Sequence, residues 1–197
     1  MKLTRNSSLE DLRNHFVQVC ENNDNRSTKA DSIFGDLDSL RQAKDNQAQV
    51  ESLEFMMLIK ASEQKLIARY EFMQSQIQRY SSIVAVIEAS LSRANTTTKF
   101  REMAKADLDH TKEMMEYHRQ IFEYTVLSQS NQVFLHFAKE QGDQQLIQTL
   151  SNRIVALVDS INNVQNEIEK RSVASKQKLM QNLNGMGKKS FFQSRFS

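Results

Sequence analysis

The sequence predicts an all-α protein, built as an elongated antiparallel bundle of three long, coiled-coil-like helices with one or two shorter N-terminal helices. The 197 residues include no proline and only four glycines, a composition that favours long helices over strands and turns. Apolar residues also recur at alternating spacings of three and four along three long stretches. We therefore expect N-terminal amphipathic helices and a polar linker in 1–49, the three-helix bundle in 50–183, and a basic, aromatic, flexible tail in 184–197.

The N-terminal segment carries a helix-start signal. Ser7 or Ser8 can cap a helix with its hydroxyl, and Glu10 or Asp11 can accept a hydrogen bond from the backbone of the cap. This helix should end in the polar, loop-like stretch 21–28. A second amphipathic segment follows, and its apolar positions are Ile33, Phe34, Leu37 and Leu40.

The first long helix is expected at about 50–93. Its apolar residues form the seam of a helix that packs along another helix at a shallow angle. The seam comprises Leu66, Tyr70, Met73, Ile77, Tyr80, Val84, Ile87 and Leu91, and it extends backwards through Glu63 to Ile59 and Met56.

The second long helix is expected at about 99–141. Thr97 or Thr98 should cap its start, and its wider apolar face should touch two neighbours. Gly142 should end this helix in the left-handed conformation, and Asp143 should cap the third long helix. Turns this short between long helices force antiparallel neighbours.

The third long helix contains a heptad seam. The seam residues are Ile147, Leu150, Ile154, Leu157, Ile161, Val164 and Ile168. Isoleucine and leucine in this alternation also suit a parallel two-stranded coiled coil. We favour a seam that packs within the chain, because connectivity already supplies neighbouring helices. The register degrades at Arg171 and Ser175, and we expect the helical pattern to end near residue 183.

The charge is uneven along the chain. After Glu169 there is no acidic residue and there are seven basic ones, so this end carries +7 and the rest −5, giving the net +2. Phenylalanines lie among these cations, which suggests contact with an anionic partner. The candidate contact residues are Lys188, Lys189, Phe191, Phe192, Arg195 and Phe196. An anionic membrane is the first expected partner and an acidic protein groove the second; nucleic acid is disfavoured. The alternative is a merely disordered end.

No residue pattern predicts a catalytic, cofactor-binding or metal site. The stretch GMGKKS at 185–190 lacks the first glycine and the Ser or Thr after Lys188 that a phosphate-binding loop needs. Asp107, His110, Glu113 and Glu116 share a helix, and Glu63 could supply a further carboxylate, as in di-metal bundles. A solvated charged face is the better interpretation. Cys20 has no paired histidine in sequence, and His118 and His136 are expected to be ordinary packed or boundary histidines.

A cytoplasmic location is expected, with a position at the periphery of a membrane as the alternative. The N-terminal residues have no apolar segment of the kind found in secretory signals. The longest apolar candidate, at 82–89, is too short to span a bilayer. The single cysteine is consistent with a reducing compartment.

These features favour a non-enzymatic scaffold, adaptor or structural subunit that binds protein partners and forms homo-oligomers. The alternative is a peripheral membrane-binding or membrane-remodelling module. In the number and length of its helices the predicted layout resembles the three-long-helix dimers called BAR domains, and no residue carries over. Against it, lysine and arginine do not cluster at the middle of the long helices. A helical toxin or secreted effector, with 82–89 as its inserting tip, ranks lower.

Overall fold

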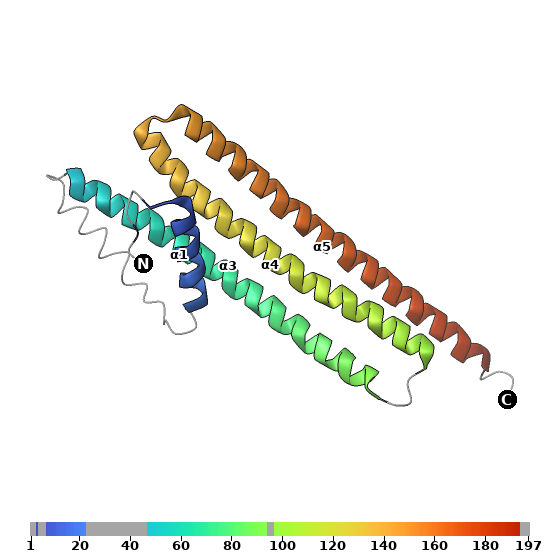
Figure 1. The fold of residues 1–197 in the computed structure, drawn as a ribbon. Helices are drawn as coiled ribbons and strands as arrows, with labels where there is room; N and C mark the ends of the chain where they lie inside the picture. The colour runs from blue at the N-terminus through green and yellow to red at the C-terminus, as the bar shows by residue number, and fades with distance from the viewer. Residues whose placement is uncertain (1–2, 4–6, 23–46, 94–96, 194–197) are drawn as a thin grey trace.

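The computed structural model describes residues 3, 7–22, 47–93 and 97–193, and over these residues the chain is helical with short connections. The helices are α1 (Leu9–Glu21), α3 (Gln47–Leu91), α4 (Thr98–Gln141) and α5 (Gln144–Gln193) (Figure 1). The predicted all-α fold is confirmed. The second amphipathic segment around Ile33 to Leu40 lies outside the described residues.

Local capping chemistry sets the helix ends. Ser8 caps α1, and its hydroxyl oxygen accepts from the Asp11 backbone N–H at 3.1 Å while the Asp11 carboxylate accepts from the Ser8 backbone N–H at 2.9 Å. Thr97 caps α4. Gly142 ends α4 with φ of 71°, and the Asp143 carboxylate accepts from the backbone N–H at the start of α5. These caps are the ones that the sequence predicts.

The three long helices run antiparallel to their neighbours along the chain, with α4 between the other two (Figure 1). Both α3 and α5 pack along α4, whereas the α3 and α5 backbones make little direct contact with each other. The expected wide face of the second long helix is confirmed, because α4 contacts α3, α5 and α1.

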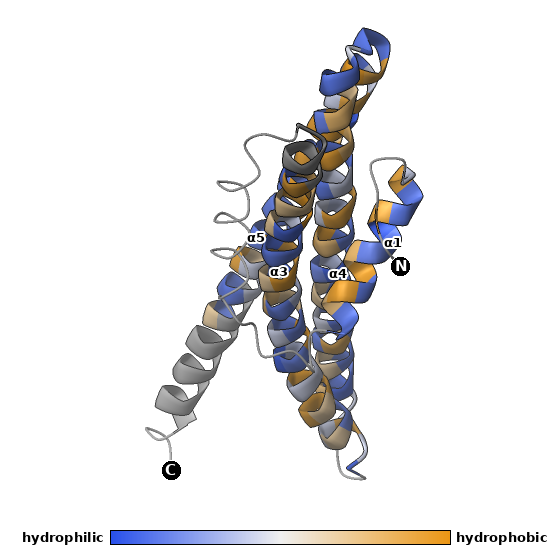
Figure 2. Cartoon of the chain, turned by 90° about the vertical axis from the view of Figure 1, so that its left-hand side faces the viewer, coloured by the Kyte–Doolittle hydropathy of each residue, from blue (hydrophilic) through white to orange (hydrophobic). Residues whose placement is uncertain are grey.

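The main apolar core lies at one end of the bundle, where α1 packs against α3 and α4. In Figure 2, α1 lies to one side of α4, and α3 and α5 lie to the other. The core residues are Leu12, Phe16, Cys20, Phe55, Ile59, Leu66, Val126, Val133 and Phe137. The docked α1 therefore makes this end, which we call the proximal end, thicker than the distal end at the α3–α4 turn.

The heptad seam of α5 faces α4, which supports packing within the chain. Only Leu150 is fully buried, at 1% exposure. The other six seam residues are half-buried: Ile147, Ile154, Leu157, Ile161, Val164 and Ile168. One neighbouring helix covers the centre of the seam and leaves its flanks accessible.

Two boundaries in the sequence interpretation were wrong. The α3 seam does not continue to Met56, which is 41% exposed; the buried residue is its neighbour Phe55. The last helix does not end near residue 183, because α5 continues to Gln193 and includes Gly185 and Gly187. A glycine inside a helix costs only about 1 kcal/mol relative to alanine, and no proline is present to stop the helix.

Candidate interaction surface

Ion pairs tie α3 and α5 to the same side of α4. Lys112 of α4 lies 3.5 Å from Glu88 of α3, and Glu113 of α4 lies 2.7 Å from Arg171 of α5. Met114 and Ile121 point to the other side of α4 and are buried, each at 2% exposure. The two helices α3 and α5 lie at the two flanks of α4. Both of them therefore cover the surface of α4 that carries Met114 and Ile121.

Exposed apolar side chains recur along each of the long helices at helical spacing. Phe72 and Ile83 of α3 are eleven residues apart, about three turns, and Val155 and Val173 of α5 are eighteen apart, about five turns. Each such pair therefore lies on one stripe of its helix. We call the following set the open face: Phe72, Ile83, Val86, Phe100, Met103, Val155, Val158, Val173 and Met180.

The open face lies opposite α1 and the ion pairs. Phe72 is nine residues, about two and a half turns, from Glu63, whose carboxylate lies 2.5 Å from His15 of α1. Val173 follows Arg171 by two residues, a rotation of about 200° around α5. Both apolar stripes thus face away from the polar contacts. The bundle has one ion-paired side, which also carries α1, and one apolar side.

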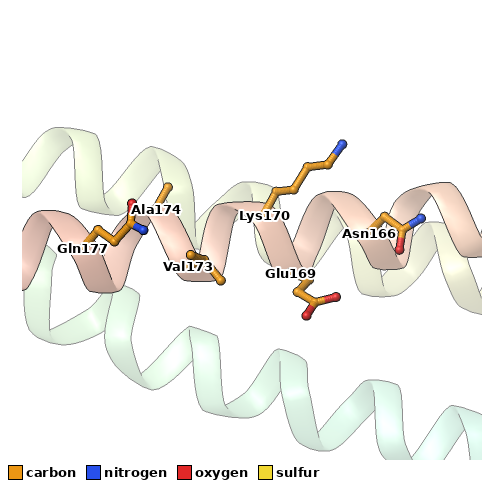
Figure 3. A pocket seen from close by; sticks show the side chains of 6 residues that line it. All are labelled: Asn166, Glu169, Lys170, Val173, Ala174 and Gln177. Carbon is orange, nitrogen blue, oxygen red and sulfur yellow. The ribbon is translucent and has the colours of Figure 1, made fainter.

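A shallow depression of about 410 Å³ lies on α5 towards its distal end (Figure 3). Figure 3 shows Val173 and Glu169 directed towards the side on which α3 runs, while Lys170 points the other way. The lining residues all come from α5: Asn166, Glu169, Lys170, Val173, Ala174 and Gln177. A hollow built by one helix suits a contacting side chain better than a small molecule, which needs enclosing walls.

Aromatic contacts form the edge of the open face along α3. The His118 ring of α4 lies 6.0 Å from Phe72 and 5.9 Å from Tyr80, and the guanidinium of Arg69 lies 5.4 Å from the Phe72 ring centre. Burial, and then the nearby positive charge of Arg69, lower the pKa of His118 below its ordinary value. The imidazole is therefore held in its neutral form.

We expect His118 to make the protein less stable in mild acid. The unfolded chain binds a proton at the ordinary histidine pKa of about 6.5, and the folded chain binds it only at lower pH. The unfolded state thus holds more protons in this window, and stability falls as the pH decreases through it. Between pH 7.5 and 5.5, the urea midpoint should fall more for the native chain than for His118→Gln. An equal fall in both proteins would contradict the structural assignment.

The tail residues stay untested as contacts. Lys188, Lys189, Phe191 and Phe192 fall within α5, but their side chains are not among those described. Arg195 and Phe196 lie outside the described residues. The proposed anionic partner of the tail therefore remains a prediction.

The residues considered for chemistry are held in structural contacts. Glu63 binds His15, and Glu113 accepts hydrogen bonds from Arg171 and, at 3.0 Å, from the Tyr117 hydroxyl. In the described part of the chain no three His, Cys, Asp or Glu side chains gather as a metal-binding group. Cys20 is buried, and this burial, followed by the charges of Glu21 and Glu63, raises its pKa to about 12. The thiol is protonated, whereas a nucleophile needs the thiolate.

Sequence reasoning missed the open face. The signal was present as apolar residues one position beside the seam, such as Val155 after Ile154 and Val158 after Leu157. Such residues widen the apolar stripe of a helix without saying which neighbour covers the extra width. The arrangement of α3 and α5 around α4 shows that none of the described helices covers it.

No protein-family profile, curated protein or solved structure matches the chain. Among residues 3, 7–22, 47–93 and 97–193, no helix contains a stretch long and apolar enough to cross a membrane.

Proposed function

We propose that the chain is a non-enzymatic helical scaffold subunit that assembles with protein helices through its open face. The observation that carries this proposal is the set of exposed apolar side chains on the three long helices, which on α3 and α5 lie opposite the ion pairs. Solvent-facing helix surfaces are ordinarily polar. An apolar side on a three-helix layer is what a partner helix covers when it completes a larger bundle.

The size of this surface supports an interaction role. The nine side chains of the open face are between 37% and 67% exposed. If each offers roughly 150–200 Å² when free, they leave roughly 800 Å² of accessible surface, which is about what one partner contributes to a standard interface.

Sedimentation velocity over a wide concentration range tests the proposal. We expect the native chain to form dimers or larger assemblies, and Val86→Asp and Val173→Asp to shift it to monomer. Both residues are exposed, at 67% and 48%, so far-UV circular dichroism should stay unchanged. Met56→Asp is the matched control, because Met56 is also exposed but lies on the stripe of Glu63, seven residues and about two turns away.

The control variant should sediment like the native chain. The proposal fails if the native chain and the open-face variants have the same mass distribution at every concentration. It also fails if Met56→Asp shifts the distribution as much as Val173→Asp does, since apolar exposure in general, and not this face, would then drive association.

A peripheral membrane role is the second candidate, and one arrangement at the distal end of α5 favours it. The exposed apolar residues Val173 and Met180 follow the exposed cations Lys170 and Lys176 by three and four residues, about one helical turn. Apolar anchors among cations suit an anionic bilayer surface. Lys170→Gln with Lys176→Gln should then reduce co-sedimentation with phosphatidylserine vesicles while leaving the sedimentation mass in solution unchanged. Binding that is equal in both proteins would remove this candidate.

A further inference from the structure

We propose that the partner on the open face is a second copy of this chain, placed parallel to the first so that α3 of each copy packs on α5 of the other. The proposal rests on the proposed function and specifies its partner and geometry. It follows from the levels at which residues of α3 and α5 occur along the bundle.

Contacts of His118 and Glu113 of α4 show which residues of α3 and α5 lie at the same height along the bundle axis. The His118 ring contacts both Phe72 and Tyr80, so its level on α3 lies midway between them, near residue 76. Glu113 binds Arg171, and His118 lies five residues along α4 from Glu113. Counting back five residues on the antiparallel α5 places the level of His118 near residue 166.

From the level of His118 towards the distal end, residues of complementary type occur at corresponding heights on α3 and α5. Three residues further towards the distal end lie Arg79 on α3 and Glu169 on α5, and four residues beyond these lie Ile83 and Val173. Arg79 and Glu169 are both exposed. Within the described residues neither side chain has a hydrogen bond or an ion pair. A basic and an acidic residue thus occur at similar heights, to within one or two helical turns, on the two helices that border the open face.

A dimer with a two-fold axis parallel to the helices brings these matched residues into contact. It keeps every residue at its own height and exchanges the left and right borders of the face, so α3 of one copy meets α5 of the other. Arg79 then faces Glu169 of the second copy, and Ile83 faces Val173, and both contacts occur twice. Four parallel helices form the centre of this dimer, and the two α4 helices lie outside.

The other face-to-face arrangement is disfavoured by charge. A two-fold axis across the helices lays α3 on α3 and α5 on α5 in antiparallel pairs. When this axis passes through the matched level, Arg79 lies against Arg79 and Glu169 lies against Glu169. Like charges held opposite each other in an interface are destabilising.

Charge exchange between two variants tests the parallel geometry. In the Arg79→Glu homodimer each contact sets two carboxylates against each other, and in the Glu169→Arg homodimer each contact sets two guanidinium groups against each other. We expect each variant alone to dimerise about tenfold or more weakly than the native chain. An equimolar mixture should recover dimer mass, because both contacts in a dimer of one variant with the other pair opposite charges.

The mixed dimer contains two different charge contacts, and together they determine its stability. One contact joins the introduced glutamate of the first variant to the introduced arginine of the second, and the other joins the native Glu169 of the first variant to the native Arg79 of the second. Both contacts pair opposite charges, so the mixed dimer has two favourable charge pairs, as the native dimer has. Each homodimer keeps neither.

Sedimentation velocity of the two variants and their mixture, each full length, gives the readout. Unchanged far-UV circular dichroism shows that the variants are folded. If the native chain dimerises and Val173→Asp abolishes the dimer, but the mixture remains as weak as the single variants, the parallel geometry is wrong while assembly through the open face stands. If the native chain and Val173→Asp are both monomers, self-assembly through this face is itself wrong.

Discussion

Phe16→Ala should reduce the free energy of unfolding by about 3–5 kcal/mol, the usual cost of removing a fully buried phenyl ring. Phe16 is 0% exposed at the centre of the core that α1 shares with α3 and α4. The loss should also loosen α1 from the bundle, because α1 attaches mainly through its buried stripe of Leu12, Phe16 and Cys20. Urea unfolding followed by far-UV circular dichroism measures the first effect.

The thiol of Cys20 reports the second effect. It is fully buried, and its pKa of about 12 leaves it protonated at neutral pH, so the folded protein should react slowly with thiol reagents. A loss of about 3 kcal/mol raises the population of an open state in which α1 is undocked by more than a hundredfold, since about 1.4 kcal/mol is a factor of ten. Labelling of Phe16→Ala should therefore accelerate by about two orders of magnitude.

Arg13→Ala is the matched control on the same helix. Arg13 lies 3.8 Å from Glu10 and 3.5 Å from Glu123 of α4, and the three side chains are 39%, 66% and 58% exposed. Exposed ion pairs contribute between nothing and about 1 kcal/mol, so the labelling rate should change only slightly. If Arg13→Ala accelerated labelling as much as Phe16→Ala, docking of α1 would depend on charge. If native Cys20 reacted as fast as an unfolded thiol, α1 would not be docked.

The helix ends could be predicted from sequence because they depend on residues a few positions apart. Ser8 with Asp11, Thr97, Gly142 and Asp143 all act within one turn of the backbone that they cap. The long helices likewise follow from composition and periodicity. These features need no knowledge of what lies beside the helix.

Features that depend on a neighbour could not be predicted in the same way. Glu63 interrupts the α3 seam, and only the docking of α1 explains it, by bringing His15 within reach. Arg171 interrupts the α5 seam because it crosses to Glu113 on α4. The open face depends on how α3 and α5 are placed around α4, and short turns fix the order of the helices without fixing that placement.

Polar interruptions of a seam therefore have a common meaning in this chain. Both mark places where one helix is fixed to another by a charge-assisted contact on the ion-paired side. Apolar residues on the flank of a seam, such as Val155, mark the opposite side. The sequence pattern located the polar interruptions, whereas the structure was needed to recognise the flanking apolar residues and to assign both kinds to two sides of the bundle.

Leu150→Ala should cost about 2–5 kcal/mol, whereas Ile161→Ala, in the same seam, should cost roughly half as much or less. Leu150 is fully buried near the α4–α5 turn, while Ile161 is only half-buried against α4. Removing a side chain that is already partly in contact with water forfeits less burial and leaves a smaller cavity. Urea unfolding of both variants, at a protein concentration where the native chain is monomeric, measures the difference.

The same pair of variants separates packing within the chain from packing between chains. If the seam stabilises α5 on α4, the loss caused by Leu150→Ala is independent of protein concentration. If the seam formed a parallel coiled coil between copies, Ile161→Ala would be as costly as Leu150→Ala, because every seam position is buried in such a coil. Both losses would then grow with protein concentration, since dimer formation contributes to stability by mass action. A large, concentration-independent effect at Leu150 and a small one at Ile161 would leave the open face as the surface available for assembly.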